Sequence, residues 1–126
     1  MDGEKMDVSN YLPYIDVNDC LNRIRGNKKL CAMLLKSFKA NPHFNEAKAA
    51  ALAGDLGKAQ MEMHTLKGMA ANLSLKRLYD LVVPVEMTLK SEMVPPEKLT
   101  PVEEALNKTL ELIDALVAEF QAEGAI

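Results

Sequence analysis

The chain has 126 residues, of which 48% are hydrophobic and 26% charged, with a formal net charge of -3. This length suits one domain with its own core and is too short for two. The mixed charges exclude the clustered Lys and Arg surface of a nucleic-acid-binding protein, and no apolar run approaches the roughly 20 residues that span a bilayer.

The N-terminal part of the chain divides into a polar tail and the start of a domain. Residues 1–10 are polar and show no periodicity, so we expect a flexible N-terminus followed by a single domain over residues 11–126. The apolar side chains of residues 11–15 are expected to lie against the core as a strap. Residues 1–10 lack the basic region followed by a hydrophobic one that is typical of a signal sequence, and Cys20 and Cys31 stand in no metal-ligand spacing. We therefore expect a cytoplasmic protein whose two cysteines are small core or boundary residues.

Capping residues mark the first two predicted helices. Asp16 as N-cap and Gly26 as a stop signal predict a short helix over about 17–25, and Asn27 caps the next one. The apolar stripe of this second helix is Leu30, Cys31, Met33, Leu34, Leu35 and Phe38. Pro42 must bend or interrupt it. We interpret residues 27–53 as one long kinked helix, with two separate helices as the alternative.

Three further helices follow. Asp55 is the predicted N-cap of the helix over residues 55–73, and Ser74 that of the helix over 75–91, in which Pro84 predicts a kink. Thr100, followed by a proline and then by Glu103, forms a capping-box pattern that predicts a helix over 100–122. These elements predict an all-α fold: an antiparallel, up-and-down four-helix bundle with a short extra N-terminal helix.

The helix over residues 55–73 has two distinct faces. Its core stripe is Leu56, Ala59, Met63, Leu66, Ala70 and Leu73. His64 lies about a hundred degrees from that stripe, in a row with Lys67 and Gly68, and is expected to face solvent. A glycine inside a helix costs about 1 kcal/mol relative to alanine, so Gly68 requires a reason. Either another molecule approaches closely there, or Gly68 and Ala71 admit a neighbouring helix and His64 is an ordinary surface residue.

The stretch from His64 to Ser74, HTLKGMAANLS, resembles the signature of histidine-containing phosphotransfer (HPt) domains. These domains are small helical bundles of multistep phosphorelays. The similarity extends from Ile15 to at least Leu89 and includes a family-like Gly54-Asp55 before the histidine helix. Ser74 departs from the family, because many members have glycine there.

The resemblance implies specific roles. His64 is the expected nucleophile, accepting a phosphoryl group on Nε2, and Lys67 the cation that reaches the phosphoryl oxygens. Imidazole suits this task because it is largely unprotonated near neutral pH and one nitrogen can attack while the other keeps its proton. From helical spacing, we expect Gln60 to hold the other ring nitrogen. Expected docking residues are Gln60, Met61, Gly68 and Ala71.

The resemblance also implies partners. We expect a response-regulator receiver domain and a sensor histidine kinase, possibly a hybrid one, bound transiently to a monomer; no cofactor is expected, because the receiver supplies the Mg²⁺.

Other function classes lack their signatures. The sequence has no glycine-rich phosphate loop or catalytic triad, so we expect no ATP binding and no kinase activity. His43 is expected to be solvated, and a di-iron bundle would require inward carboxylates, whereas the register places them outward. The main alternative is a helical adaptor with the same bundle, in which His64 transfers nothing.

Overall fold

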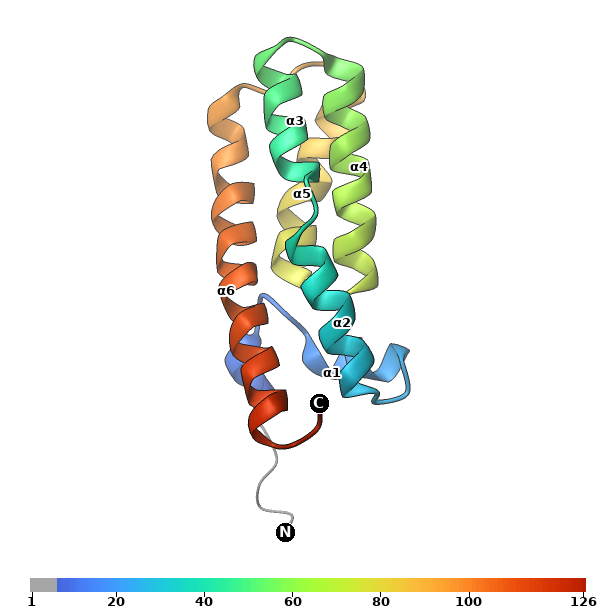
Figure 1. Cartoon of the computed structure of the whole chain (residues 1–126). Helices are drawn as coiled ribbons and strands as arrows, with labels where there is room; N and C mark the ends of the chain where they lie inside the picture. The colour runs from blue at the N-terminus through green and yellow to red at the C-terminus, as the bar shows by residue number, and fades with distance from the viewer. Residues whose placement is uncertain (1–6) are drawn as a thin grey trace.

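The computed structural model describes residues 7–126, which are helical and contain no strand (Figure 1). The elements in chain order are η2 (Val8–Tyr11), α1 (Val17–Arg23), α2 (Lys28–Lys39), α3 (His43–Leu52), α4 (Leu56–Asn72), α5 (Lys76–Leu89), η3 (Pro96–Leu99) and α6 (Thr100–Ala122). The predicted all-α fold class is confirmed. Across the described part of the chain, no helix is both long and apolar enough to cross a membrane.

The long helices lie side by side around a common core. Short turns join α3 to α4 and α4 to α5, and α6 packs against α5 and α2 (Figure 1). The core includes large, fully buried side chains from α2, α4, α5 and α6, such as Phe38, Met63, Leu78 and Phe120. At one end, α1 and η2 lie near α2 and the end of α6 (Figure 1). The molecule therefore has one continuous core.

Pro42 separates two helices, so the prediction of one kinked helix over residues 27–53 is wrong. The backbone leaves the helical conformation between α2 and α3, because proline lacks an N–H and disfavours a helical residue before it. The Asn41 side chain forms hydrogen bonds with both the end of α2 and the start of α3. Its amide nitrogen donates to the Phe38 carbonyl at 2.6 Å, and its Oδ1 accepts from the His43 N–H at 2.9 Å.

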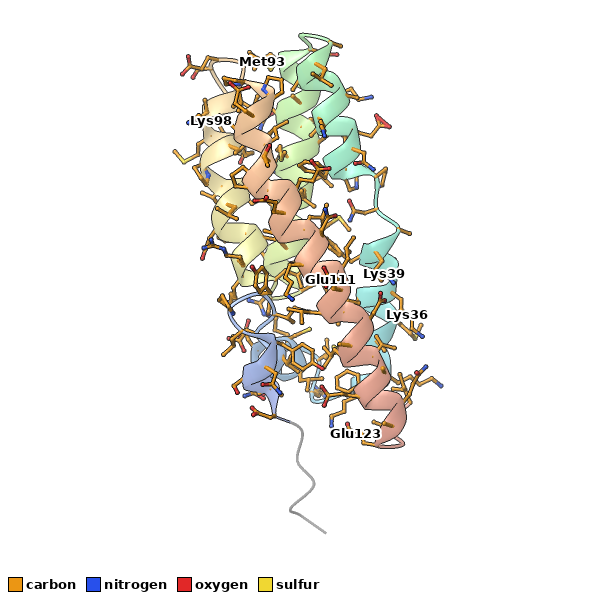
Figure 2. The ribbon with its side chains drawn as sticks, turned by 90° about the vertical axis from the view of Figure 1, so that its left-hand side faces the viewer. Lys36, Lys39, Met93, Lys98, Glu111 and Glu123 are labelled. Carbon is orange, nitrogen blue, oxygen red and sulfur yellow. The ribbon has the colours of Figure 1, made fainter. Side chains whose placement is uncertain are left out.

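The buried stripe of α2 is narrower than predicted. Cys31, Leu35 and Phe38 are buried, whereas Met33 is 59% and Leu34 37% exposed. The reason is that α2 has neighbours on only part of its circumference, chiefly α6 and α1. Both free cysteines are buried, as predicted, with their sulfur atoms 3.7 Å apart. Two ion pairs connect α2 with α6 and its C-terminal end: Lys39 pairs with Asp114, and Lys28 pairs with Glu123. Lys39 and Glu123 are labelled in Figure 2.

The predicted caps at Asp16, Asn27 and Asp55 are confirmed, because each side chain accepts from a backbone N–H in the first turn of its helix. The prediction for Ser74 is wrong: it adopts the left-handed conformation, with φ of 58°, and Leu75 occupies the N-cap position. This backbone geometry explains why glycine suits this position. The Ser74 side chain is buried.

The capping box at Thr100 is also absent. Thr100 already has helical dihedrals, because η3 leads directly into α6, and its side chain caps nothing. Glu103 instead pairs with Lys48 of α3 at 3.2 Å.

The strap before α1 is partly confirmed. Tyr11 and Ile15 are buried, and the Tyr11 hydroxyl donates to the Glu119 carboxylate of α6, whereas Leu12 is half-exposed. Of the tail predicted to be flexible, residues 1–6 lie outside the described residues, and η2 begins within the remainder at Val8.

Asn41→Ala is expected to destabilise the protein by about 1–2 kcal/mol, because it removes both side-chain bonds across the α2–α3 break. Urea unfolding followed by circular dichroism measures the change. Asn45→Ala, at an exposed position on α3, serves as the control. Equal effects of the two substitutions would contradict the bridging role of Asn41.

Candidate functional site

The buried stripe of α4 determines which side chains of this helix face solvent. Ala59, Met63, Leu66 and Ala70 are fully buried, as predicted, and fix the rotation of the helix. His64 therefore lies outside the core, with 64% of its side chain exposed. The predicted exposure of His64 and Gly68 is confirmed, while Lys67 is half-buried.

Gly68 has no packing reason to be glycine. A Cβ added there would meet no other atom within 4 Å, so no neighbouring helix in the described structure requires the missing side chain. Met61, one turn before His64, is 57% exposed, whereas Ala71 is half-buried. The surface around His64 on α4 is thus open to an approaching molecule.

The central feature of the site is Glu86 of α5, which is fully buried. Its Oε2 accepts a hydrogen bond from Gln60 Nε2 at 2.7 Å, and its Oε1 accepts one from Lys67 Nζ at 2.5 Å. Lys90 Nζ lies 3.8 Å from Oε2. Two polar side chains of α4 thereby converge on one carboxylate of α5.

The charge of Glu86 is stabilised by these partners. Burial raises its pKa, but the hydrogen bonds from Lys67 and Gln60, together with the charges of Lys67 and Lys90, outweigh burial and lower it from 4.5 to about 2. The carboxylate is consequently ionised at neutral pH.

The His64 ring is oriented relative to this carboxylate. Its Nδ1 lies 3.7 Å from Glu86 Oε1, a separation that is longer than a hydrogen bond but close enough for direct electrostatic interaction. Nδ1 is therefore the ring nitrogen beside the buried anion, on a ring whose side chain is mostly exposed.

Comparison with known families decides the identity of this arrangement. The family profile described as Hpt domain matches residues 32–123, which is most of the chain. The chain belongs to the Hpt domain family. No curated protein and no solved structure matches it significantly. The match includes the exposed histidine, Lys67 and Glu86, whereas α1 and η2 lie outside the matched range.

Two sequence predictions about this Hpt domain need correction. Gln60 was expected to contact the histidine ring, but it donates to Glu86. The carboxylates were expected to point outward, but Glu86 is buried and is the group that faces Nδ1. The sequence does contain a signal for it: Glu86 falls between Val82 and Leu89 in the apolar pattern of α5, where an unpaired charge would be costly.

The second histidine lies apart from the site and was also mispredicted. His43 is half-buried rather than solvated, and its Nδ1 lies 2.7 Å from Glu62 Oε1 of α4. Within residues 7–126 no group of His, Cys, Asp and Glu side chains is arranged to hold a metal ion.

Glu86 is expected to make stability depend on pH. Between about pH 4.5 and pH 2 the unfolded chain binds a proton at Glu86 that the folded protein does not bind. The contribution of the ionised Glu86 to the free energy of unfolding is therefore fully present above pH 4.5 and is lost as the pH falls towards 2. Urea unfolding at pH 7, 4 and 2.5 should therefore show Glu86→Gln less stable than wild type at pH 7, with the difference shrinking at pH 2.5. Glu104→Gln, which removes an exposed carboxylate, is the control. A difference independent of pH would contradict this assignment.

Proposed function

We propose that His64 carries a phosphoryl group between partners in a phosphorelay. In the accepting step, Nε2 attacks the phosphorus of a receiver's aspartyl phosphate, the N–P bond forms, and the P–O bond to the aspartate breaks so that the carboxylate leaves. Transfer to a second response-regulator aspartate reverses these bond changes. The observation that carries the proposal is the exposed imidazole whose Nδ1 faces the buried Glu86.

Glu86 prepares the ring for this reaction. A carboxylate beside Nδ1 favours the tautomer with its proton on that nitrogen, which leaves the lone pair on Nε2. The same negative charge stabilises the ring as it becomes positive while the N–P bond forms. Glu86 thus acts on the reaction through His64, as a positioning residue.

Lys67 has two positions in this proposal. In the unphosphorylated protein its ammonium group is held by Glu86 and offsets the buried charge. Because lysine is a compact cation on a flexible stem, it can turn towards the phosphoryl oxygens on Nε2, where solvent screening limits the gain. Gln60 and Lys90 remain beside Glu86 and keep its charge compensated during that movement.

The partners follow from the chemistry that this chain lacks. Phosphoryl transfer depends on positioning and charge neutralisation, so we propose that a receiver domain supplies the Mg²⁺ and the acceptor or donor aspartate. A sensor histidine kinase, possibly a hybrid, is the ultimate source of the phosphoryl group. The protein acts as a cytoplasmic monomer without its own cofactor.

The short turns between helices support an antiparallel, up-and-down four-helix bundle. In this bundle α2 and α3 together form one of the four helical columns, and α4, α5 and α6 form the other three.

His64→Gln is expected to abolish phosphorylation, because glutamine has no nucleophilic ring nitrogen to place beside Glu86. The test incubates the protein with a receiver domain phosphorylated by acetyl phosphate and measures acid-labile, base-stable phosphate on the protein, with helix content checked by circular dichroism. His43→Gln is the matched control and should remain active.

The outcomes separate the candidate functions. Lys67→Ala should keep receiver binding and slow transfer, because it removes a charge from the phosphoryl site. It also removes a partner of the buried Glu86, so urea unfolding of this variant is measured alongside its transfer rate. A wild-type protein that binds receivers and takes up no phosphate would establish a non-catalytic adaptor instead.

Gly68→Val is expected to fold normally and to slow transfer at least tenfold, because a branched side chain projects from the surface that a receiver must approach. Gly68→Ala, with a smaller side chain, should stabilise the helix by about 0.5–1 kcal/mol and slow transfer less. Stopped-flow transfer kinetics and urea unfolding measure the two effects. Unchanged transfer in folded Gly68→Val would refute docking on this surface.

A further inference from the structure

A pocket lies where α1 meets the end of α4 and the start of α5. Its volume is about 220 Å³, and it is lined by Arg23, Ala70, Ala71, Ser74, Lys76 and Tyr79. Ala71 is seven residues after His64 on the same row of α4, which places it about 10 Å along the helix axis. We call these six residues the basic notch.

The basic notch lies within reach of any partner that contacts His64. A typical protein–protein interface covers roughly 800 Å² on each side, equivalent to a disc of about 16 Å radius. A receiver centred on His64 therefore extends over the basic notch. This step rests on the proposed function, because it takes the receiver as the partner.

The charges at the basic notch are unbalanced. Arg23 Nε lies 3.3 Å and Lys76 Nζ 3.5 Å from the same Oδ2 of Asp19, and the Ser74 hydroxyl donates to that oxygen at 2.5 Å. One negative charge thus faces two positive charges, and about half of the side-chain surface of each cation is exposed. The remaining positive charge is open to solvent at the rim.

Each cation retains donors for a further anion. Arginine presents five N–H donors and lysine three, and the contacts with Asp19 use only one nitrogen of each. A guanidinium can bind a second carboxylate through its free edge, with two parallel hydrogen bonds. Tyr79, 36% exposed, adds an aromatic wall on the α5 side.

We propose that the basic notch binds an acidic side chain of the receiver domain and so contributes to the choice among receivers. Two observations support this role over one in the transfer chemistry. Arg23 and Asp19 belong to α1, which lies outside the range matched by the family profile, whereas His64, Lys67 and Glu86 lie inside it. The basic notch is also about two helical turns from the reacting nitrogen, so it can affect docking without touching the phosphoryl group.

The test reverses both charges in Arg23→Glu/Lys76→Glu and measures transfer from a receiver domain phosphorylated by acetyl phosphate, using the most active donor from a panel of receivers. The control pair Lys98→Glu/Lys108→Glu makes the same net charge change at exposed positions, with Lys98 at the end of the molecule far from α1 (Figure 2). Phosphoramidate, a small donor that phosphorylates imidazole without a receiver, tests the intrinsic reactivity of His64 in every variant.

We expect the notch pair to raise the KM for the phosphorylated receiver about tenfold with kcat nearly unchanged, and the difference from wild type to shrink at high salt. Labelling by phosphoramidate should be unchanged, and the control pair should change KM less than twofold. The neutral pair Arg23→Gln/Lys76→Gln introduces no negative charge beside Asp19 and so does not repel α1. It should raise KM about threefold, which separates the loss of positive charge from a displacement of α1.

An unchanged KM in the notch pair, or an equal rise in both pairs, would overturn the inference while leaving the phosphorelay function intact. Failure of every phosphorylated receiver to label the wild type, with phosphoramidate labelling still present, would instead contradict the proposed function.

Discussion

The buried carboxylate of Glu86 connects the packing of this domain to the surface around His64. Removing a charge from water costs several kcal/mol unless hydrogen bonds and opposite charges compensate it. Glu86 obtains that compensation from Gln60 and Lys67 of α4 and from Lys90 of its own helix. Because two of these partners flank His64, the bonds that make the buried charge tolerable also hold α4 against α5 at the histidine. The position of the His64 ring thus depends on the same interaction that joins the two helices.

The site is rigid beneath the histidine and open above it. The fully buried stripe of α4 prevents the helix from rotating, while Gly68 and the outer edge of the imidazole leave space for a partner. Such a surface fits the proposed relay, in which a carrier exposes its nucleophile to more than one protein and releases each of them. A small interface with few anchoring contacts dissociates quickly, and a deep pocket would slow that exchange.

The short helix α1 connects the end of the bundle to this surface. Asp19 accepts a bond from Ser74, the residue with left-handed backbone geometry that ends α4, and thereby fixes α1 against the turn between α4 and α5. Ser74 accepts the strained conformation because its hydroxyl gains a charge-assisted hydrogen bond there, which a glycine cannot form. The helix that lies outside the family match is in this way attached to the turn that follows α4, the helix that carries His64.

The sequence by itself determined the helical fold, three of the caps and the exposure of His64, because these depend on local spacing: a side chain one position from the buried Met63 must face another direction. Local proline geometry allowed either a kink or a break at Pro42, and the structure has the break. Only the tertiary structure decided that Gln60 contacts Glu86 and that Ser74 ends a helix without capping the next. Each depends on which face of one element meets which face of another. Periodicity places Glu86 in an apolar stripe, but the two side chains that donate hydrogen bonds to it come from α4, 19 and 26 residues earlier in the chain.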